Sequence, residues 1–283
     1  MLPGEREREL VPALATREFE ERLALLGERY RLVPASQLLR AARARRRRER
    51  IPVALTFDDD LRSHVEVTAP LLRQADAPAT FFVGPPLDAG DAFWWEDLQA
   101  VAERCPPRLV SLPDLDLTPL NNGTPWAIHS VAGMIERLGP DKRDEVAAEL
   151  RVLVGPDTRR RLDGAGIASL AAAGFEVGFH TRRHYPLPTL DDDRLARELS
   201  EGRDVLAEIV GRRVTMIAYP HGKADARVAL AARSAGYEIG FTTRQVRIDI
   251  RTNPLLIGRT EVHSAPLDAF EKRLVLALSA GTP

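Results

Sequence analysis

The sequence alternates between apolar runs of strand length and segments with helical periodicity, and this alternation limits the possible folds more than any other feature. The runs at 51–57, 79–83 and 175–179 are short and dense in branched and aromatic residues. A strand, helix, strand order gives parallel strands, because consecutive parallel strands need a crossover. The pattern predicts an α/β protein, either a (β/α) barrel or a doubly wound sheet, with its site where the strands end.

The remaining expected elements follow from the same two periods. Helices are expected at 16–29, 65–74, 167–173, 193–210, 226–235 and 267–278, and strands at 214–219, 238–242 and 255–262. Thr16 is expected to cap the first helix. Between 85 and 165 the alternation of strands and helices stops, and helical stretches are expected at 127–138 and 141–153 instead. We therefore expect residues 1–283 to form a single domain with a helical insertion at about 85–165.

Composition excludes several classes of protein. With 44% hydrophobic and 29% charged residues in 283, the chain can bury a globular core. Forty Lys and Arg against 41 Asp and Glu argue against nucleic acid or an anionic membrane as the main partner. No apolar run is long enough for a membrane span, and the single Cys105 cannot form an internal disulfide. The chain as given is expected in the cytoplasm, and outside the cell if a leader has been trimmed.

Three of the apolar runs end in side chains that bind metals. The first ends in Asp58–Asp60, the second in His180 with His184 four residues later, and the third in the segment 218–222, which contains a further histidine. Because the carboxyl ends of parallel strands meet at one edge, we expect these groups at one mouth. Two imidazoles and one carboxylate leave a coordination position open on a divalent ion, which is typical of a catalytic site.

The spacing within each motif sets conditions on this interpretation. His180 and His184 lie on one side if the chain turns helically between them, and two separate surface histidines are the alternative. Asp58 and Asp59 can both reach one ion only if the strand has ended, because neighbouring strand residues point to opposite faces. One carboxylate then binds the metal while the other accepts a proton; the alternative is a set of acids at the start of the next helix.

These motifs resemble those of the polysaccharide deacetylases, the NodB-like domains of carbohydrate esterase family 4. The similar segments are 56–59, 180–184 and 218–222, in that order, with further similarity at 19–39, 78–83 and 172–178. The third motif is similar to the Ala-Tyr-Pro branch of the family. The resemblance implies a distorted (β/α) barrel that removes N-acetyl groups from amino sugars of a polysaccharide, oligosaccharide or glycoconjugate. It makes 1–283 one polysaccharide deacetylase-like catalytic domain with the insertion described above.

The resemblance also implies roles for single residues. By position, Asp59, His180 and His184 would bind one divalent metal ion, with zinc expected and cobalt, nickel or manganese as alternatives. Asp58 would be the general base. The backbone N–H of His221 would hold the developing oxyanion, a role that needs no particular side chain.

Two candidates lie near the last predicted strand. His263, placed by alternation on the same face as Glu261 and Arg259, is a candidate general acid, and a surface histidine is the alternative. Arg259 is also a candidate substrate contact, and the resemblance suggests that it orients Asp58 by ion pairing. His64, in the helix after the aspartates, is expected to face solvent.

Four other residues are candidates for substrate binding: Tyr219, Pro220, Asp60 and Trp95. Asp60 stands where the family usually has Gly, and is a further ligand, a substrate contact or a disturbance of the turn. Trp95, with Trp94, either stacks on a sugar ring or anchors a helix of the insertion.

Two other functions stay open at this point. One is hydrolysis of a carbon-nitrogen bond in a non-polymeric amide, for which the same metal and carboxylates would serve. The other is a catalytically inactive carbohydrate-binding relative, for which Asp60 and the unclear last histidine motif are the reasons. An N-acetylated sugar is the expected partner, and the sequence does not indicate an oligomeric state.

Overall fold

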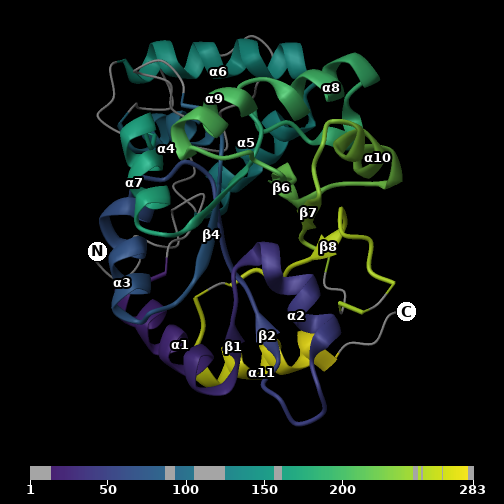
Figure 1. Ribbon diagram of the computed structural model, residues 1–283. Helices are drawn as coiled ribbons and strands as arrows, with labels where there is room; N and C mark the ends of the chain where they lie inside the picture. Colours follow the sequence, from purple (N-terminus) through teal and green to yellow (C-terminus); the bar gives the residue numbers. More distant parts are fainter. Residues whose placement is uncertain are drawn as a thin grey trace. The chain divides into compact units, whose positions relative to one another are not determined.

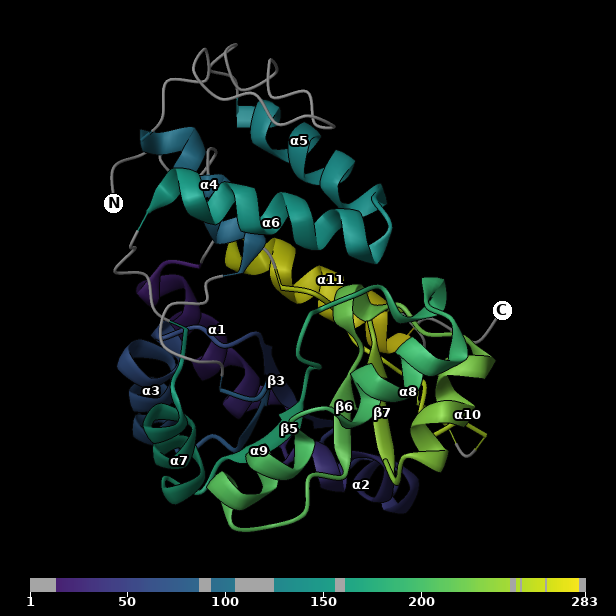
Figure 2. The ribbon, with the colours of Figure 1, turned by 90° about the horizontal axis from the view of Figure 1, so that it is seen from above.

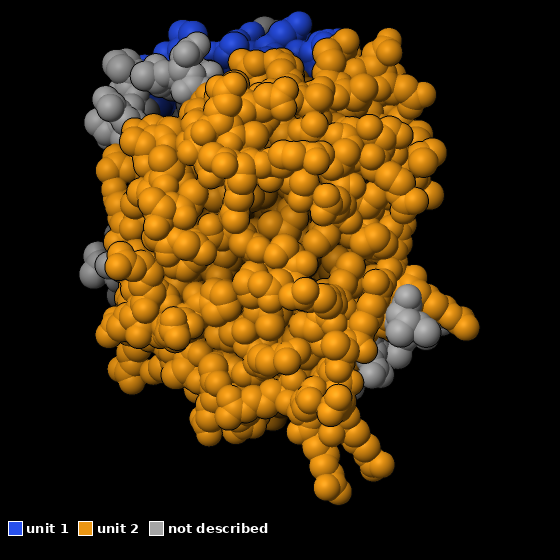
Figure 3. Space-filling view, in the orientation of Figure 1, with its two compact units in different colours: residues 1–13, 87–161 blue, residues 14–86, 162–283 orange. Residues whose placement is uncertain are grey.

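The structure is a computed structural model that describes residues 14–86, 93–104, 125–155, 161–244, 248–249, 251–262 and 264–279. The chain divides into two compact units, one of residues 1–13 and 87–161 and the other of residues 14–86 and 162–283 (Figure 3). Each unit has its own hydrophobic core. That the chain is one catalytic domain with an insertion at about 85–165 stays a prediction. Among the described residues, none of the helices has the length and apolar character that a membrane span needs.

In the described part of the chain, the larger unit is built on a six-stranded parallel sheet whose strands pair in chain order (Figures 1 and 2). The strands are β3 (Leu55–Asp58), β4 (Ala79–Val83), β5 (Glu176–Phe179), β6 (Met216–Ala218), β7 (Ile239–Thr242) and β8 (Ile257–Gly258). In Figure 2 the strands follow a curve, so the sheet is curled rather than flat. All six carboxyl ends lie at one edge, because every pairing is parallel.

The run at 51–57 is two strands rather than the single predicted one. β2 (Pro52–Val53) pairs with β1 (Arg31–Leu32) in a separate two-stranded parallel sheet, and β3 begins after Ala54. The last strand also differs from the prediction, because β8 ends at Gly258 and residues 259–262 lie beyond it. The predicted strand at 255–262 is therefore too long, and the placement of Arg259, Glu261 and His263 on one face stays a prediction.

Helices pack around the larger sheet, and their buried residues form the core of the unit together with those of the strands. They are α1 (Thr16–Arg29), α2 (Leu38–Ala44), α3 (Ala69–Gln74), α7 (Gly164–Ala172), α8 (Asp192–Ser200), α9 (Arg203–Val210), α10 (Ala226–Ser234) and α11 (Leu267–Ser279). The predicted helix at 193–210 is the pair α8 and α9, because Gly202 adopts a left-handed conformation with φ 83°. The N-cap of the first helix is Ala15, so the prediction that Thr16 caps it is wrong and Thr16 is its first residue. The Glu18 carboxylate accepts the Ala15 N–H at 3.0 Å.

The centre of the core is β4, where all five residues are buried. Phe81 stacks on Phe57 with ring centroids 5.1 Å apart and meets Phe175 edge-on at 5.4 Å. A parallel strand covered on both faces has no polar face, which explains the continuous apolar run in the sequence. This rigid centre fixes the strand ends that carry the candidate site.

The described part of the smaller unit is helical. It contains α4 (Trp94–Arg104), α5 (Pro125–Arg137) and α6 (Pro140–Val154), near the helices predicted in this region. Its core includes Leu98, Ile135 and Leu150, each fully buried. Trp95 stacks on Phe93 with centroids 4.0 Å apart.

Candidate metal-binding active site

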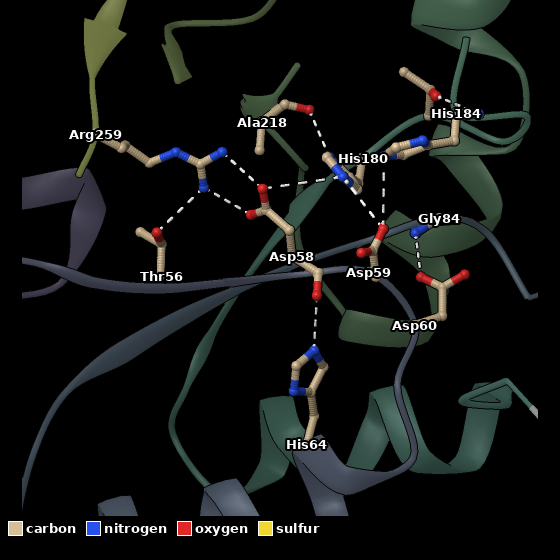
Figure 4. Close-up of polar contacts among 11 residues, drawn as sticks. Thr56, Asp58, Asp59, Asp60, His64, Gly84, His180, His184, Ala218 and Arg259 are labelled. Carbon is tan, nitrogen blue, oxygen red and sulfur yellow. Dashed lines mark hydrogen bonds and ion pairs between the residues drawn. The ribbon is translucent and has the colours of Figure 1, made fainter. Parts of the chain in front are cut away.

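The first motif turns sharply after β3. Asp58 is the last residue of the strand, and Asp59 follows in a left-handed conformation with φ 70°. This conformation is one that aspartate, unlike most residues other than glycine, adopts comparatively readily. It breaks the strand alternation, so both carboxylates approach His180 Nε2, with Asp59 Oδ1 at 3.5 Å and Asp58 Oδ2 at 4.0 Å (Figure 4). The condition that the strand ends between the two aspartates is met.

His180 is fixed by two neighbouring strands. It directly follows β5, its backbone N–H donates to Val83 O at 2.9 Å, and its Nδ1 lies 2.8 Å from Ala218 O at the end of β6. A ring nitrogen facing a carbonyl oxygen must carry the proton. The neutral tautomer therefore presents the Nε2 lone pair to Asp59. Ligating histidines commonly donate their other ring N–H to a backbone carbonyl in this way.

His184 reaches the same point by a loop. Residues 181–184 are not helical, because Thr181 and His184 have φ values of 64° and 53°. The helical turn that was the stated condition for convergence is absent, and the two side chains converge without it. His184 Nε2 lies 3.7 Å from Asp59 Oδ1, and the two imidazole centroids are 4.9 Å apart.

The three groups fit a divalent metal ion. One donor atom each from Asp59, His180 and His184 lies within 4.8 Å of the other two. Zinc bonds of about 2.0–2.2 Å place two tetrahedral ligands roughly 3.3–3.6 Å apart, close to the 3.5 and 3.7 Å found here. Imidazole and carboxylate are also donors that zinc accepts readily.

Asp58 is held by Arg259. The guanidinium Nη1 and Nη2 each lie 2.7 Å from one Asp58 oxygen, and Nη1 also lies 3.2 Å from Thr56 Oγ1 (Figure 4). Arg259 directly follows β8, so it joins the last strand of the curled sheet to the first. Burial acts to raise the pKa of Asp58, but the charge of Arg259 and its hydrogen bonds to the carboxylate outweigh it and the pKa lies below its usual value. Asp58 is therefore a carboxylate at neutral pH.

His64 is buried, which corrects the expectation that it faces solvent. It is 5% exposed, because the segment His64–Thr68 forms a π-helical turn that directs the ring toward the sheet. The His64 ring packs against Phe57 and Phe81, and its Nε2 donates to Asp58 O at 2.9 Å. Burial lowers the pKa of His64, although the bond to Asp58 opposes the shift.

The third motif forms a short turn beside the histidines. His221 has φ 56°, and its ring centroid lies 4.5 Å from that of His184. Tyr219 is fully buried and its hydroxyl donates to Leu255 O at 2.9 Å, so the phenol is a core group. Pro220 is also buried. Both ends of this motif therefore lie next to a candidate ligand, Ala218 beside His180 and His221 beside His184.

The other candidates are not members of this cluster of three donors or lie outside the described residues. Asp60 is 3% exposed; its Oδ1 accepts the Gly84 N–H at 2.6 Å and its carbonyl accepts the Leu162 N–H at 2.7 Å, so it joins three loops. Trp95 belongs to the smaller unit, where it is buried. His263 lies outside the described residues.

Two acidic residues near the site were not predicted: Glu198, in α8, and Glu201, which directly follows that helix. Glu198 and Glu201 bind the arginines between the two histidines, Arg182 and Arg183. The available signal for these contacts was a pair of arginines between two candidate ligands, followed by two glutamates in and directly after the next long helix. Their separation of 15 to 19 residues gave no reason to pair them.

Comparison with known proteins agrees with the motifs. Residues 153–240 match the family model described as polysaccharide deacetylase. The fold is similar to that of the Streptococcus pyogenes deacetylase PplD in complex with acetate, with TM-score 0.59 and 18% identity over 93% of this chain and 87% of that one. It is also similar to IcaB from Ammonifex degensii, with TM-score 0.58 and 19% identity over 98% of this chain and 93% of that one.

A third similar structure is the BpsB deacetylase domain from Bordetella bronchiseptica, with TM-score 0.54 and 16% identity over 92% of this chain and 86% of that one. Comparison with curated proteins gave no match. The predicted fold class, a distorted (β/α) barrel of the polysaccharide deacetylase type, is confirmed, and so is the resemblance to that family.

Proposed function

We propose that this chain, with its polysaccharide deacetylase fold, is a metal-dependent hydrolase that removes N-acetyl groups from amino sugars. The family match supports deacetylation of polysaccharides as the class of reaction. The observation that carries the proposal is the convergence of Asp59, His180 and His184 beside the ionised Asp58. Zinc is the proposed ion, because two imidazoles and a carboxylate suit it.

The bound ion would polarise the acetamido carbonyl and acidify water, which is the chemistry that the protein's own groups lack. Asp58 accepts the proton of the attacking water at one of its carboxylate oxygens. Arg259 binds both of these oxygens, so the base cannot rotate away from His180. Deprotonation of water and attack on the carbonyl carbon then break the C–N bond and give acetate and a free amine.

Two further groups complete the proposed reaction. The backbone N–H of His221 stabilises the developing oxyanion, and the turn at this residue lies next to the His184 ring. His263 is the proposed acid that protonates the leaving amine.

Acetate release from N-acetylglucosamine oligomers tests the proposal. The purified chain should release acetate with Zn²⁺ or Co²⁺ and lose the activity when a chelator removes the metal. Turnover of cyclic amides without any acetate from the oligomers would refute the sugar substrate. A chain that binds no divalent metal and releases no acetate would refute the proposed function as a whole.

A further inference from the structure

The loop that carries His184 is bound to α8 by a buried carboxylate. Glu198 is 2% exposed, and both of its oxygens face Arg183. Oε1 accepts from Arg183 Nη1 at 2.8 Å, and Oε2 accepts from the Arg183 backbone N–H at 3.3 Å. One glutamate thus holds the side chain and the main chain of the residue immediately before a candidate ligand.

A second carboxylate extends this contact toward the surface. Glu201 lies 2.7 Å from Arg183 Nη1 and 3.2 Å from Nη2, and it also pairs with Arg182. These two glutamates and two arginines form one network, which we call the α8 clamp. It holds Arg182 and Arg183, two of the three residues between His180 and His184.

The loop needs such support, because its backbone is strained. Thr181 and His184 both adopt left-handed conformations, which residues other than glycine rarely adopt. Such conformations persist only where the surrounding structure fixes them. Within the loop, the His184 N–H donates to Thr181 Oγ1 at 3.2 Å. The α8 clamp joins the loop to a neighbouring helix.

Helix stability alone does not explain a buried Glu198. A buried ion pair contributes little to stability compared with apolar residues of similar volume. Glu198 lies on the same helix as Leu195 and Leu199, which fill the core. An apolar side chain there would pack as well but would leave Arg183 and its backbone N–H without their acceptors.

We propose that Glu198 and Arg183 are positioning residues that hold His184 in its metal-binding orientation toward Asp59. The inference rests on the proposed metal site and adds to it a support from α8. Groups that orient ligating histidines typically change metal affinity about 10–100-fold when they are removed. The His180 ring is oriented by Ala218 O, and the α8 clamp would act on His184 through the backbone of Arg183.

The test measures Zn²⁺ affinity by chelator competition and the Co²⁺ absorption spectrum of the folded protein. Glu198→Ala and Arg183→Ala should each weaken Zn²⁺ binding about 10–100-fold and alter the Co²⁺ spectrum. Glu198→Gln keeps one acceptor oxygen and should recover part of the affinity. The double variant should lose little more than the weaker-binding single one, because the two residues act through one contact.

Asp192→Ala is the matched control. It removes an ion pair of the same helix, Asp192 to Arg227 at 2.7 Å, that does not touch the histidine loop. It should leave Zn²⁺ affinity and the Co²⁺ spectrum unchanged. If Glu198→Ala does not fold, Arg183→Ala decides the question, because the Arg183 side chain is 37% exposed.

Two outcomes separate this inference from the proposed function. A lower melting temperature with wild-type Zn²⁺ affinity and an unchanged Co²⁺ spectrum would show a purely structural clamp and overturn the inference, while the metal site would stand. Absence of metal binding in the wild-type chain would instead overturn the metal site and the inference with it.

Discussion

The substitution Tyr219→Phe tests whether the Tyr219 hydroxyl stabilises the core or binds substrate. The substitution removes only the hydroxyl, which donates to Leu255 O at 2.9 Å inside the core. A buried hydrogen bond contributes about 0.5–1.5 kcal/mol, and an acceptor left buried without this donor adds to the loss, so we expect destabilisation of about 1–2 kcal/mol. For a chain of this size that lowers the melting temperature by about 2–8 °C.

The kinetic constants of Tyr219→Phe should not change as they would if the hydroxyl contacted substrate. Because the phenol is fully buried, kcat/KM for acetate release should not change when assayed well below the melting temperature. The structure supplies a matched control in Tyr237, also buried, whose hydroxyl donates to Leu199 O at 2.8 Å. Tyr237→Phe should lower the melting temperature by a similar amount.

The comparison of the two tyrosine variants gives a clear refutation. If KM rises in Tyr219→Phe and not in Tyr237→Phe, the hydroxyl of Tyr219 contacts substrate and the buried orientation is wrong. Equal stability losses with unchanged kinetics would assign both hydroxyls to the core.

Three further predictions concern the site. Asp58→Asn should keep stoichiometric Zn²⁺ and reduce kcat by about 10²–10⁴-fold, because it removes the proton acceptor and no ligand; parallel metal analysis and acetate assays check both parts. Arg259→Ala removes the charge that lowers the pKa of Asp58, so the acidic limb of the pH–rate profile should move to higher pH. The pKa of His64 is lower in the folded protein, so the unfolded state binds its proton more tightly. The contribution of neutral His64 to stability should therefore be fully present above about pH 6.5 and fall as the pH drops below that value. In His64→Phe the melting temperature should depend less on pH in this acidic range.

The convergence of Asp59 and His180 could be predicted because it depends on strand ends alone. Asp59 and His180 each follow an apolar run directly, and parallel strands bring such positions to one edge whatever their separation in sequence. His184 was placed correctly for a different reason than the expected one. Its spacing from His180 suggested a helical turn, whereas the loop reaches the same point through two left-handed residues.

The features that could not be predicted depend on long-range partners. The run 51–57 contains no signal that β2 and β3 join different sheets, because pairing is decided by strands elsewhere in the chain. Gly202 inside a helical pattern is compatible with either a continuous helix or a break. His64 was treated as polar and exposed, but its partner is the backbone carbonyl of Asp58, which no side-chain pattern reveals.

The groups that hold the site come from strands and helices other than those that supply the ligands. His180 follows β5 and is fixed by Ala218 at the end of β6, while Asp58 ends β3 and is fixed by Arg259 after β8. His184 depends on α8 through Arg183. Each contact therefore forms only when the curled sheet and its covering helices are in register. We therefore expect metal affinity to be lost before the core unfolds. A small displacement of β6, β8 or α8 breaks one of these hydrogen bonds, whereas the apolar packing around β4 persists.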